Sequence, residues 1–313
     1  MNATGLLRKS INAILTACLL AGPLIDLHAE NVQPRDTIAL WSGTKVPYGS
    51  EVTLMTFIPE NPNGVSAVVC PGGSYHWLDQ TGEGTEVGEW LCSHGITAFV
   101  LYYRTAGVPE FICHTRILFR GKRHPDMIQD AQKALLWVWE HADEYGVDRN
   151  RTGIVGFSAG GHLAMSTACF SSTDFLKDEG IITDADLRPA FVASIYPVVT
   201  MREPYVHRRS RRGLLGDNRI GSKKMKDSLS LELHIPDNCP PVFIVNCIDD
   251  PVVDYRNSVL LDSALTSRGA EHRYIQYRTG KHGFGVSDWF GSPECREWKN
   301  ELLVWLKGYY PSL

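Results

Sequence analysis

Gly156-Phe157-Ser158-Ala159-Gly160 is the stretch that decides the fold of this chain. The apolar residues 152–155 before it predict a buried strand, and residues 161–168 after it predict the start of a helix. A turn between strand and helix is too sharp for bulky neighbours, and glycines at both ends remove that clash. The pattern therefore predicts a strand–turn–helix with the serine hydroxyl in the open and the Ala159 N–H beside it at a helix N-terminus.

Length and composition fit a globular protein with ample core. The chain has 313 residues, 43% of them hydrophobic, which suits one large α/β domain or two small ones. The formal net charge is −4, so we expect no nucleic-acid partner. The cysteines form no C-x-x-C pair, and we expect neither a metal nor a cofactor. The oligomeric state stays open.

The first 29 residues have the pattern of a secretory signal peptide. Arg8 and Lys9 precede an apolar run over residues 11–25, which is too short to span a bilayer, and Ala29 offers a cleavage site. One alternative is a lipid anchor at Cys18, whose preceding residues resemble a lipobox. We therefore expect residues 1–29 to be a signal peptide, residues 30–313 to be a single domain, and the protein to be secreted or periplasmic without stable membrane insertion.

Seven cysteines follow residue 29, and an odd number in an exported chain excludes complete internal pairing. Cys70, Cys169 and Cys247 lie in apolar stretches and are expected to act as small core hydrophobes. Cys113 belongs to a loop-like stretch and is a candidate for a bridge to another loop cysteine. The pairing stays open.

Apolar runs and helical periods alternate along the rest of the chain. Residues 51–58 predict an edge-type antiparallel strand that ends at Pro59. Further strands are expected over residues 65–70, 96–103, 191–196, 241–246 and 272–277, and helices over residues 86–94, 126–145, 255–268 and 293–307. This alternation predicts one α/β domain with a doubly wound, mostly parallel sheet and helices on both faces.

Two long stretches lack a clear period. Residues 105–123 are expected to form a long loop beside the site, as part of a lid. Residues 200–233 form a second excursion that contains the basic run 207–212. Such a run can contact anionic polymers, but because the chain is acidic overall we interpret it as a solvated loop.

A serine hydroxyl is a poor nucleophile until a base takes its proton, and the base is usually a histidine oriented by a carboxylate. On a sheet of this kind the expected order is serine, acid, histidine. Asp249-Asp250 follows the predicted strand 241–246, and His282 follows the strand 272–277 in a glycine-rich loop. Both loops lie at the carboxyl edge of the sheet, where such sites are built. Ser158, Asp250 and His282 are therefore the candidate catalytic residues.

The remaining roles near these residues are assigned as follows. Asp250 is preferred to Asp249 because it stands directly before the Pro-Val-Val turn, and Asp249 is expected to cap or brace the loop. His162 lies inside the predicted helix and is interpreted as support for the site. A tetrahedral intermediate needs two N–H donors. Ala159 supplies one, and the other is expected from Gly73 or Ser74, in the glycine-rich turn after the strand 65–70.

These residues resemble the α/β-hydrolase superfamily, and more narrowly the secreted bacterial acetylxylan esterases and feruloyl esterases. The resemblance covers most of residues 50–307. It is carried by residues 70–75, which resemble the P-G-G-G-Y oxyanion loop with Ser74 in place of the last glycine, and by residues 145–164, 249–253 and 282–285. It implies an α/β-hydrolase fold, with Asp250 as the equivalent of the catalytic acid.

The leading functional interpretation is a serine esterase that removes acetyl or aryl ester groups from plant or algal polysaccharide, so the expected partner is an acylated oligo- or polysaccharide. A serine peptidase of the prolyl-oligopeptidase type shares the same triad, but residues 30–50 leave no room for a propeller before the first predicted strand. A non-catalytic glycan-binding relative is the third interpretation, and the intact triad argues against it.

Overall fold

A computed structural model describes residues 36–313, and the predicted signal peptide and the alternative anchor at Cys18 lie outside the described residues. The described residues 36–313 lie within one compact unit. No helix within the described part of the chain is both long and apolar enough to cross a membrane.

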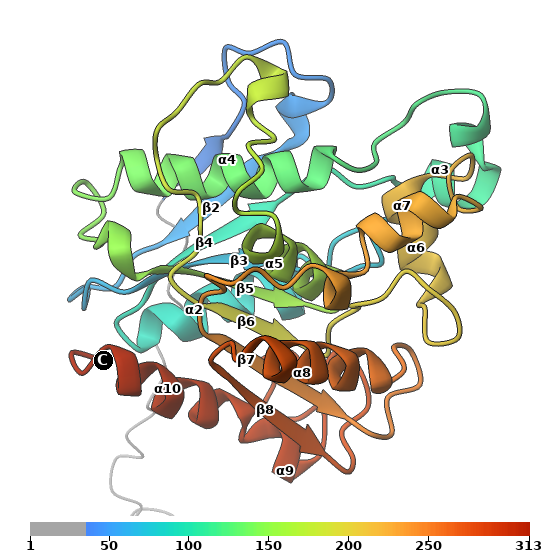
Figure 1. Ribbon diagram of the computed structural model, residues 1–313. Coiled ribbons are helices and arrows are strands. Elements are labelled where there is room, and N and C mark those ends of the chain that lie inside the picture. Colours follow the sequence, from blue (N-terminus) through green and yellow to red (C-terminus); the bar gives the residue numbers. More distant parts are fainter. Residues whose placement is uncertain (1–35) are drawn as a thin grey trace, which may run out of the picture. The chain divides into compact units, whose positions relative to one another are not determined.

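An eight-stranded sheet in the order β1-β2-β4-β3-β5-β6-β7-β8 forms the centre of this unit (Figure 1). Strands β1 and β2 run antiparallel to their neighbours, and all other pairs are parallel. The strands are β1 (Thr37–Ala39), β2 (Thr53–Phe57), β3 (Ser66–Cys70), β4 (Thr97–Tyr102), β5 (Thr152–Phe157), β6 (Val192–Ile195), β7 (Val242–Cys247) and β8 (His272–Tyr277). The predicted mostly parallel α/β sheet is thus confirmed.

Helices cover both faces of the sheet (Figure 1). The α-helices are α2 (Glu86–Ser93), α3 (Val108–Cys113), α4 (Asp126–Glu140), α5 (Ala159–Cys169), α6 (Arg208–Leu215), α7 (Lys223–Ser228), α8 (Arg256–Arg268), α9 (Pro293–Arg296) and α10 (Trp298–Tyr309). Short turns of other helix types are η1 (Gly49–Glu51), the π-helical η2 (Thr81–Thr85), η3 (Thr115–Ile117), η4 (Arg149–Arg151), η5 (Lys177–Glu179) and η6 (Leu231–Leu233).

Alternation along β3 shows why the sheet is buried on both faces. Val68 and Cys70 pack into the core under α4 and α5, whereas Ala67 and Val69 pack into the core under α2 and α10. Every position of β3 is therefore apolar or small, which produces the continuous run seen in the sequence. The predicted core positions of Cys70, Cys169 and Cys247 are also confirmed, since all three are buried free thiols.

Three local predictions are wrong. Strand β2 is antiparallel, as predicted, but it is not an edge, because β1 pairs along its other side. Residues 105–123 are not irregular throughout, since they contain α3 and η3. The basic run 207–212 is not a solvated loop, because most of it forms the first turns of α6.

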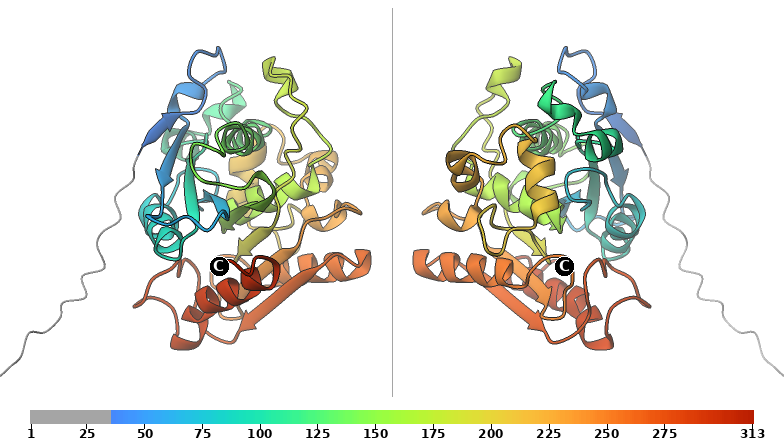
Figure 2. Two further views of the ribbon diagram at one scale, coloured as in Figure 1. Left: turned by 90° about the vertical axis from the view of Figure 1, so that its left-hand side faces the viewer. Right: turned by 90° about the vertical axis from the view of Figure 1, so that its right-hand side faces the viewer.

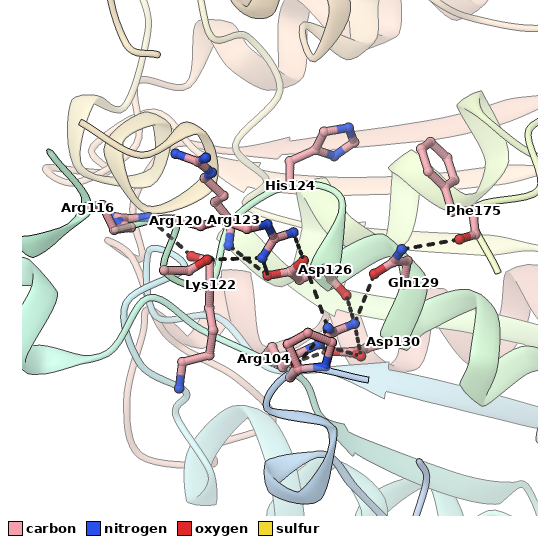
Figure 3. A network of polar contacts seen from close by, with 12 residues as sticks. Arg104, Arg116, Arg120, Lys122, Arg123, His124, Asp126, Gln129, Asp130 and Phe175 are labelled. Atoms are coloured by element: carbon pink, nitrogen blue, oxygen red, sulfur yellow. Dashed lines mark hydrogen bonds and ion pairs between the residues drawn. The ribbon is translucent and has the colours of Figure 1, made fainter. Parts of the chain in front are cut away.

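Ion pairs, some of them buried, explain how the segment with α3 is held without an apolar period (Figure 3). Arg104, just after β4, contacts Asp130 of α4, with guanidinium and carboxylate oxygen 2.8 Å apart and both side chains buried. Arg120 pairs with Asp126 at the start of α4. Arg116 pairs with Glu110 and donates to the carbonyl oxygen of Gly213 in α6. These polar contacts, which a hydrophobic pattern does not reveal, anchor the segment to α4 and α6.

Candidate active site

Ser158 occupies the turn between β5 and α5. Its backbone has φ 53° and ψ −116°, a region that non-glycine residues rarely adopt. The flanking glycines are required by close approach, because a Cβ on Gly160 would lie 2.0 Å from the carbonyl oxygen of Cys70, and one on Gly156 would lie 2.1 Å from that of Gly160. The expectation of an open hydroxyl is wrong, since Ser158 is only 5% exposed. Nε2 of His282 contacts its oxygen, and Gly72 packs against its Cβ.

His282 stands between a hydroxyl and a carboxylate. Its Nδ1 lies 2.6 Å from Oδ2 of Asp250, and its Nε2 lies 2.9 Å from Oγ of Ser158. A carboxylate only accepts hydrogen bonds, so Nδ1–H donates to Asp250 and Nε2 accepts from the Ser158 hydroxyl. The three side chains come from the loops after β8, β7 and β5, at the carboxyl edge of the sheet. This arrangement can move a proton from the serine to the imidazole.

The two neighbouring aspartates do different things. The other carboxylate oxygen of Asp250 accepts from the backbone N–H groups of Val252 and Val253, at 2.8 and 3.0 Å. These bonds aim the carboxylate at His282. Asp249 instead accepts a hydrogen bond from the N–H of Lys281 at 2.9 Å. It thereby connects the loop after β7, the acid loop, to the loop after β8, the histidine loop.

The glycine-rich turn after β3, residues 71–75, packs against Ser158 and is called the oxyanion turn below because it holds the candidate oxyanion donors. A Cβ on Gly72 would lie 2.9 Å from Cβ of Ser158, so the turn lies directly beside it. Gly73 and Ser74 have φ values of 135° and 59°, which twist the backbone around that point. Within residues 36–313, neither of their N–H groups donates a hydrogen bond to another protein group. Together with Ala159, the first residue of α5, they are available to bind an oxyanion.

Glu83 is a buried carboxylate that the sequence analysis did not identify. It lies in the π-helical turn η2 and accepts hydrogen bonds from the Gly72 N–H at 2.7 Å and the Tyr196 hydroxyl at 2.8 Å. Burial raises the pKa of its carboxyl, and the nearby His282 and these hydrogen bonds oppose that rise. The Tyr196 hydroxyl in turn accepts from the N–H of Gly285 at 3.0 Å. Glu83 therefore connects the oxyanion turn to the histidine loop.

Tyr196 also supports the imidazole itself. Its ring centroid lies 4.7 Å from that of His282, and its own backbone has φ 37° at the end of β6. The only sequence signals for this pair are an acid between two glycines, Gly82-Glu83-Gly84, and a tyrosine before Pro197. Neither signal predicts that two residues so far apart in the chain meet.

We expect Glu83→Gln to lower kcat for p-nitrophenyl acetate by roughly ten- to a hundredfold while KM changes little. The two donors approach different oxygens of Glu83, and an amide has only one. The donor that loses its partner is buried, which costs about 1–3 kcal/mol, and we expect this loss to misplace the oxyanion turn or the imidazole. Steady-state kinetics with thermal unfolding curves measure this. The exposed Glu86, three residues later, gives the matched control Glu86→Gln. A kcat for Glu83→Gln within twofold of the wild type would contradict the positioning role.

His162 is placed in α5, as the sequence indicates, and both ring nitrogens are occupied. Nε2 lies 2.9 Å from the carbonyl oxygen of Leu229 and therefore carries the proton, so Nδ1 accepts from the Tyr75 hydroxyl at 2.7 Å. Burial lowers the pKa of His162 to about 4. The neutral ring thus holds Tyr75, the last residue of the oxyanion turn.

The helices α3, α6 and α7 gather at the end of the molecule where the carboxyl ends of the parallel strands lie (Figures 1 and 2). A Cβ on Gly213 of α6 would lie 2.4 Å from the carbonyl oxygen of Ser74, so α6 packs directly on the oxyanion turn. The stretch 105–123 therefore borders the site, through the contacts of Arg116 with α6. Among the residues that the structure describes, no group of three or more His, Cys, Asp or Glu side chains is arranged to hold a metal ion.

Known proteins resemble this chain in sequence and in fold. Residues 114–265 match the family model described as BD-FAE. The chain is 31% identical to the acetylxylan esterase of Xylanibacter ruminicola over 256 residues, which are 81% of this chain and 48% of that protein. It is 32% identical to the endo-1,4-β-xylanase B of Butyrivibrio fibrisolvens over 222 residues, 71% of this chain and 32% of that protein. The chain thus spans about half the length, or less, of these curated relatives.

A solved structure matches over nearly its whole length. It is the acetyl ester-xyloside bifunctional hydrolase of Caldicellulosiruptor lactoaceticus, with a TM-score of 0.73, 28% sequence identity, and coverage of 89% of this chain and 97% of that one. The strand order and the strand–turn–helix at Ser158 point to the same fold as these relatives. The chain therefore has the α/β-hydrolase fold, and it is similar to proteins that are named as carboxylic-ester hydrolases.

Proposed function

We propose that this protein is a serine esterase that removes acetyl or related acyl groups from plant or algal polysaccharides. The observation that carries the proposal is the position of the His282 imidazole, 2.9 Å from the Ser158 hydroxyl and 2.6 Å from the Asp250 carboxylate. The relatives named as acetylxylan esterase and acetyl ester-xyloside hydrolase support the choice of an acetylated xylan as substrate.

The proposed reaction has two halves. Ser158 Oγ attacks the ester carbonyl carbon while Nε2 of His282 takes its proton, and Asp250 stabilises the imidazolium. The N–H groups of Ala159 and of Gly73 or Ser74 hold the oxyanion. The carbon–oxygen bond to the sugar breaks, and His282 returns the proton to the leaving hydroxyl, which leaves an acyl group on Ser158. Water, deprotonated by His282, then attacks this acyl-enzyme and releases the carboxylic acid and the free serine.

A secreted or periplasmic location is part of the proposal, since polymeric substrates lie outside the cell. It rests on the pattern of residues 1–29 alone, with lipidation at Cys18 as the alternative.

A panel of three substrates tests the function. We expect release of acetate from acetylated xylo-oligosaccharides, slower release of ferulate from feruloyl esters, and no cleavage of proline amides. Acid release by chromatography and p-nitroanilide assays measure the three rates. Preferred cleavage of proline amides would replace the esterase with the peptidase, and no turnover of any substrate together with glycan binding would favour a non-catalytic binding protein.

A further inference from the structure

Helix α6 contains four arginines, at positions 208, 209, 211 and 212, and lies on the side shown in the right-hand view of Figure 2. Just before it, His207 lines the same cavity as Asp250. Burial, His282 and Arg209 lower the pKa of His207 to about 4, and Asp250 opposes this. Further along, Gly213 packs on Ser74. The helix therefore runs past the reacting groups from the histidine loop to the oxyanion turn.

Three of these four arginines have a carboxylate within 4.0 Å, and two of them share the same one. Arg208 and Arg211 lie 3.5 and 3.4 Å from Glu203, and Arg212 lies 2.7 Å from Asp217. Arg209 is exposed, and among residues 36–313 it has no carboxylate partner within 4.0 Å. Arg209 is thus the arginine of this helix whose charge has no carboxylate beside it among the described residues.

The Arg209 guanidinium lies over two aromatic rings, 5.7 Å from the ring centroid of Trp77 and 5.9 Å from that of Phe111. The two rings meet edge to face at 5.6 Å, and both are half-buried. Cation–π contact holds the guanidinium in place without using its N–H donors. The rings and the guanidinium together form an aromatic wall with a fixed cation.

This wall adjoins the oxyanion turn. A Cβ on Gly73 would lie 2.8 Å from Cδ1 of Trp77, so the indole borders the candidate oxyanion donor. Next to it, His76 is 1% exposed, and neither ring nitrogen has a hydrogen-bond partner among the described residues. Burial and the nearby arginines lower the pKa of His76 to about 4, so the ring is neutral. The half-buried Trp77 indole thus lies beside the turn that holds Gly73, with the buried His76 ring behind it.

We propose that Arg209, Trp77 and Phe111 form a subsite for a sugar that carries a carboxylate, namely a uronic-acid substituent on the acylated polysaccharide. This inference rests on the proposed function, because it names the substrate class of the same site. The apolar face of the pyranose ring packs on the Trp77 indole. The planar Arg209 guanidinium binds the carboxylate through paired N–H donors, the geometry for which arginine is suited.

Binding of non-acetylated xylo-oligosaccharides tests the subsite without any turnover. Two ligands of equal length are compared by calorimetry, one with a glucuronic-acid branch and one without. The wild type is expected to bind the acidic ligand about tenfold more tightly, as one charge-assisted contact allows. Arg209→Gln is expected to remove this preference, and Arg209→Lys to restore part of it. The matched control is Arg208→Gln, whose side chain is 79% exposed and paired with Glu203, and it should keep the preference.

Equal binding of both ligands by the wild type, or a preference that survives in Arg209→Gln, would overturn the subsite. Failure of the esterase proposal gives a different result, because p-nitrophenyl acetate would then not be hydrolysed by the wild type. The acetylated forms of the two ligands add a kinetic readout, in which the ratio of their kcat/KM values should fall about tenfold in Arg209→Gln.

Discussion

Ser158→Ala is expected to lower kcat for p-nitrophenyl acetate by about 10⁶-fold, to the level set by binding and oxyanion contacts alone. The reason is that, within residues 36–313, Nε2 of His282 forms a hydrogen bond with no hydroxyl other than that of Ser158. Without Oγ the imidazole has no nucleophile to activate and no acyl-enzyme forms. The absorbance of released p-nitrophenol at 405 nm measures the loss, with both proteins at the same concentration of folded enzyme.

The matched control is Ser172→Ala, an exposed serine shortly after α5. Its turnover should equal that of the wild type. Ser158→Ala should remain folded, because the small side chain loses one hydrogen bond to a half-buried ring, so a thermal unfolding curve near that of the wild type separates chemistry from stability. Retained turnover in folded Ser158→Ala would reject the mechanism.

Asp250→Asn is expected to lower kcat by about 10⁴-fold with little change in KM. An amide in place of the carboxylate carries no charge to stabilise the imidazolium, and its NH₂ group can turn the imidazole to the wrong tautomer. Val252 and Val253 would still find an amide oxygen, so the loop keeps its shape. Steady-state kinetics over a range of pH measure the loss.

Asp249→Asn is the paired experiment, since the neighbouring aspartate differs only in its partner. Its amide oxygen can still accept from the Lys281 N–H, so we expect kcat to fall by less than about tenfold. If Asp249→Asn proved the more damaging of the two, the orienting role would belong to Asp249, and the assignment of Asp250 would be wrong.

Sequence reasoning predicted those parts of the fold that depend on periodic burial. Strands such as β3 and β5 are apolar at every position because both faces are covered, and the long amphipathic pattern of α4 follows from one buried face. The elements that the sequence did not predict are held in place by polar contacts. The arginine-rich α6 has little apolar surface, and its residues pair with Glu203 and Asp217 and receive the Arg116 guanidinium at their carbonyl groups. No periodicity records such partners.

The candidate site divides in the same way. Ser158, Asp250 and His282 each stand at the end of a strand in a recognisable local motif, so their order and spacing in the sequence carry information. Glu83 and Tyr196 have no such motif, and their meaning arises only when the sheet brings η2 beside the end of β6. The candidate catalytic residues can therefore be recognised in the sequence, whereas the residues that position them are identified only from tertiary contacts.

The central claim is that Ser158 is an activated nucleophile. A fluorophosphonate probe tests it most directly, because this reagent labels only a serine whose proton is removed by a neighbouring base. The protein is incubated with the probe, digested, and mapped by mass spectrometry, beside Ser158→Ala. The account predicts stoichiometric label on the peptide that contains Ser158 and none in the variant, whereas an unlabelled wild type, or label on another residue, would contradict it.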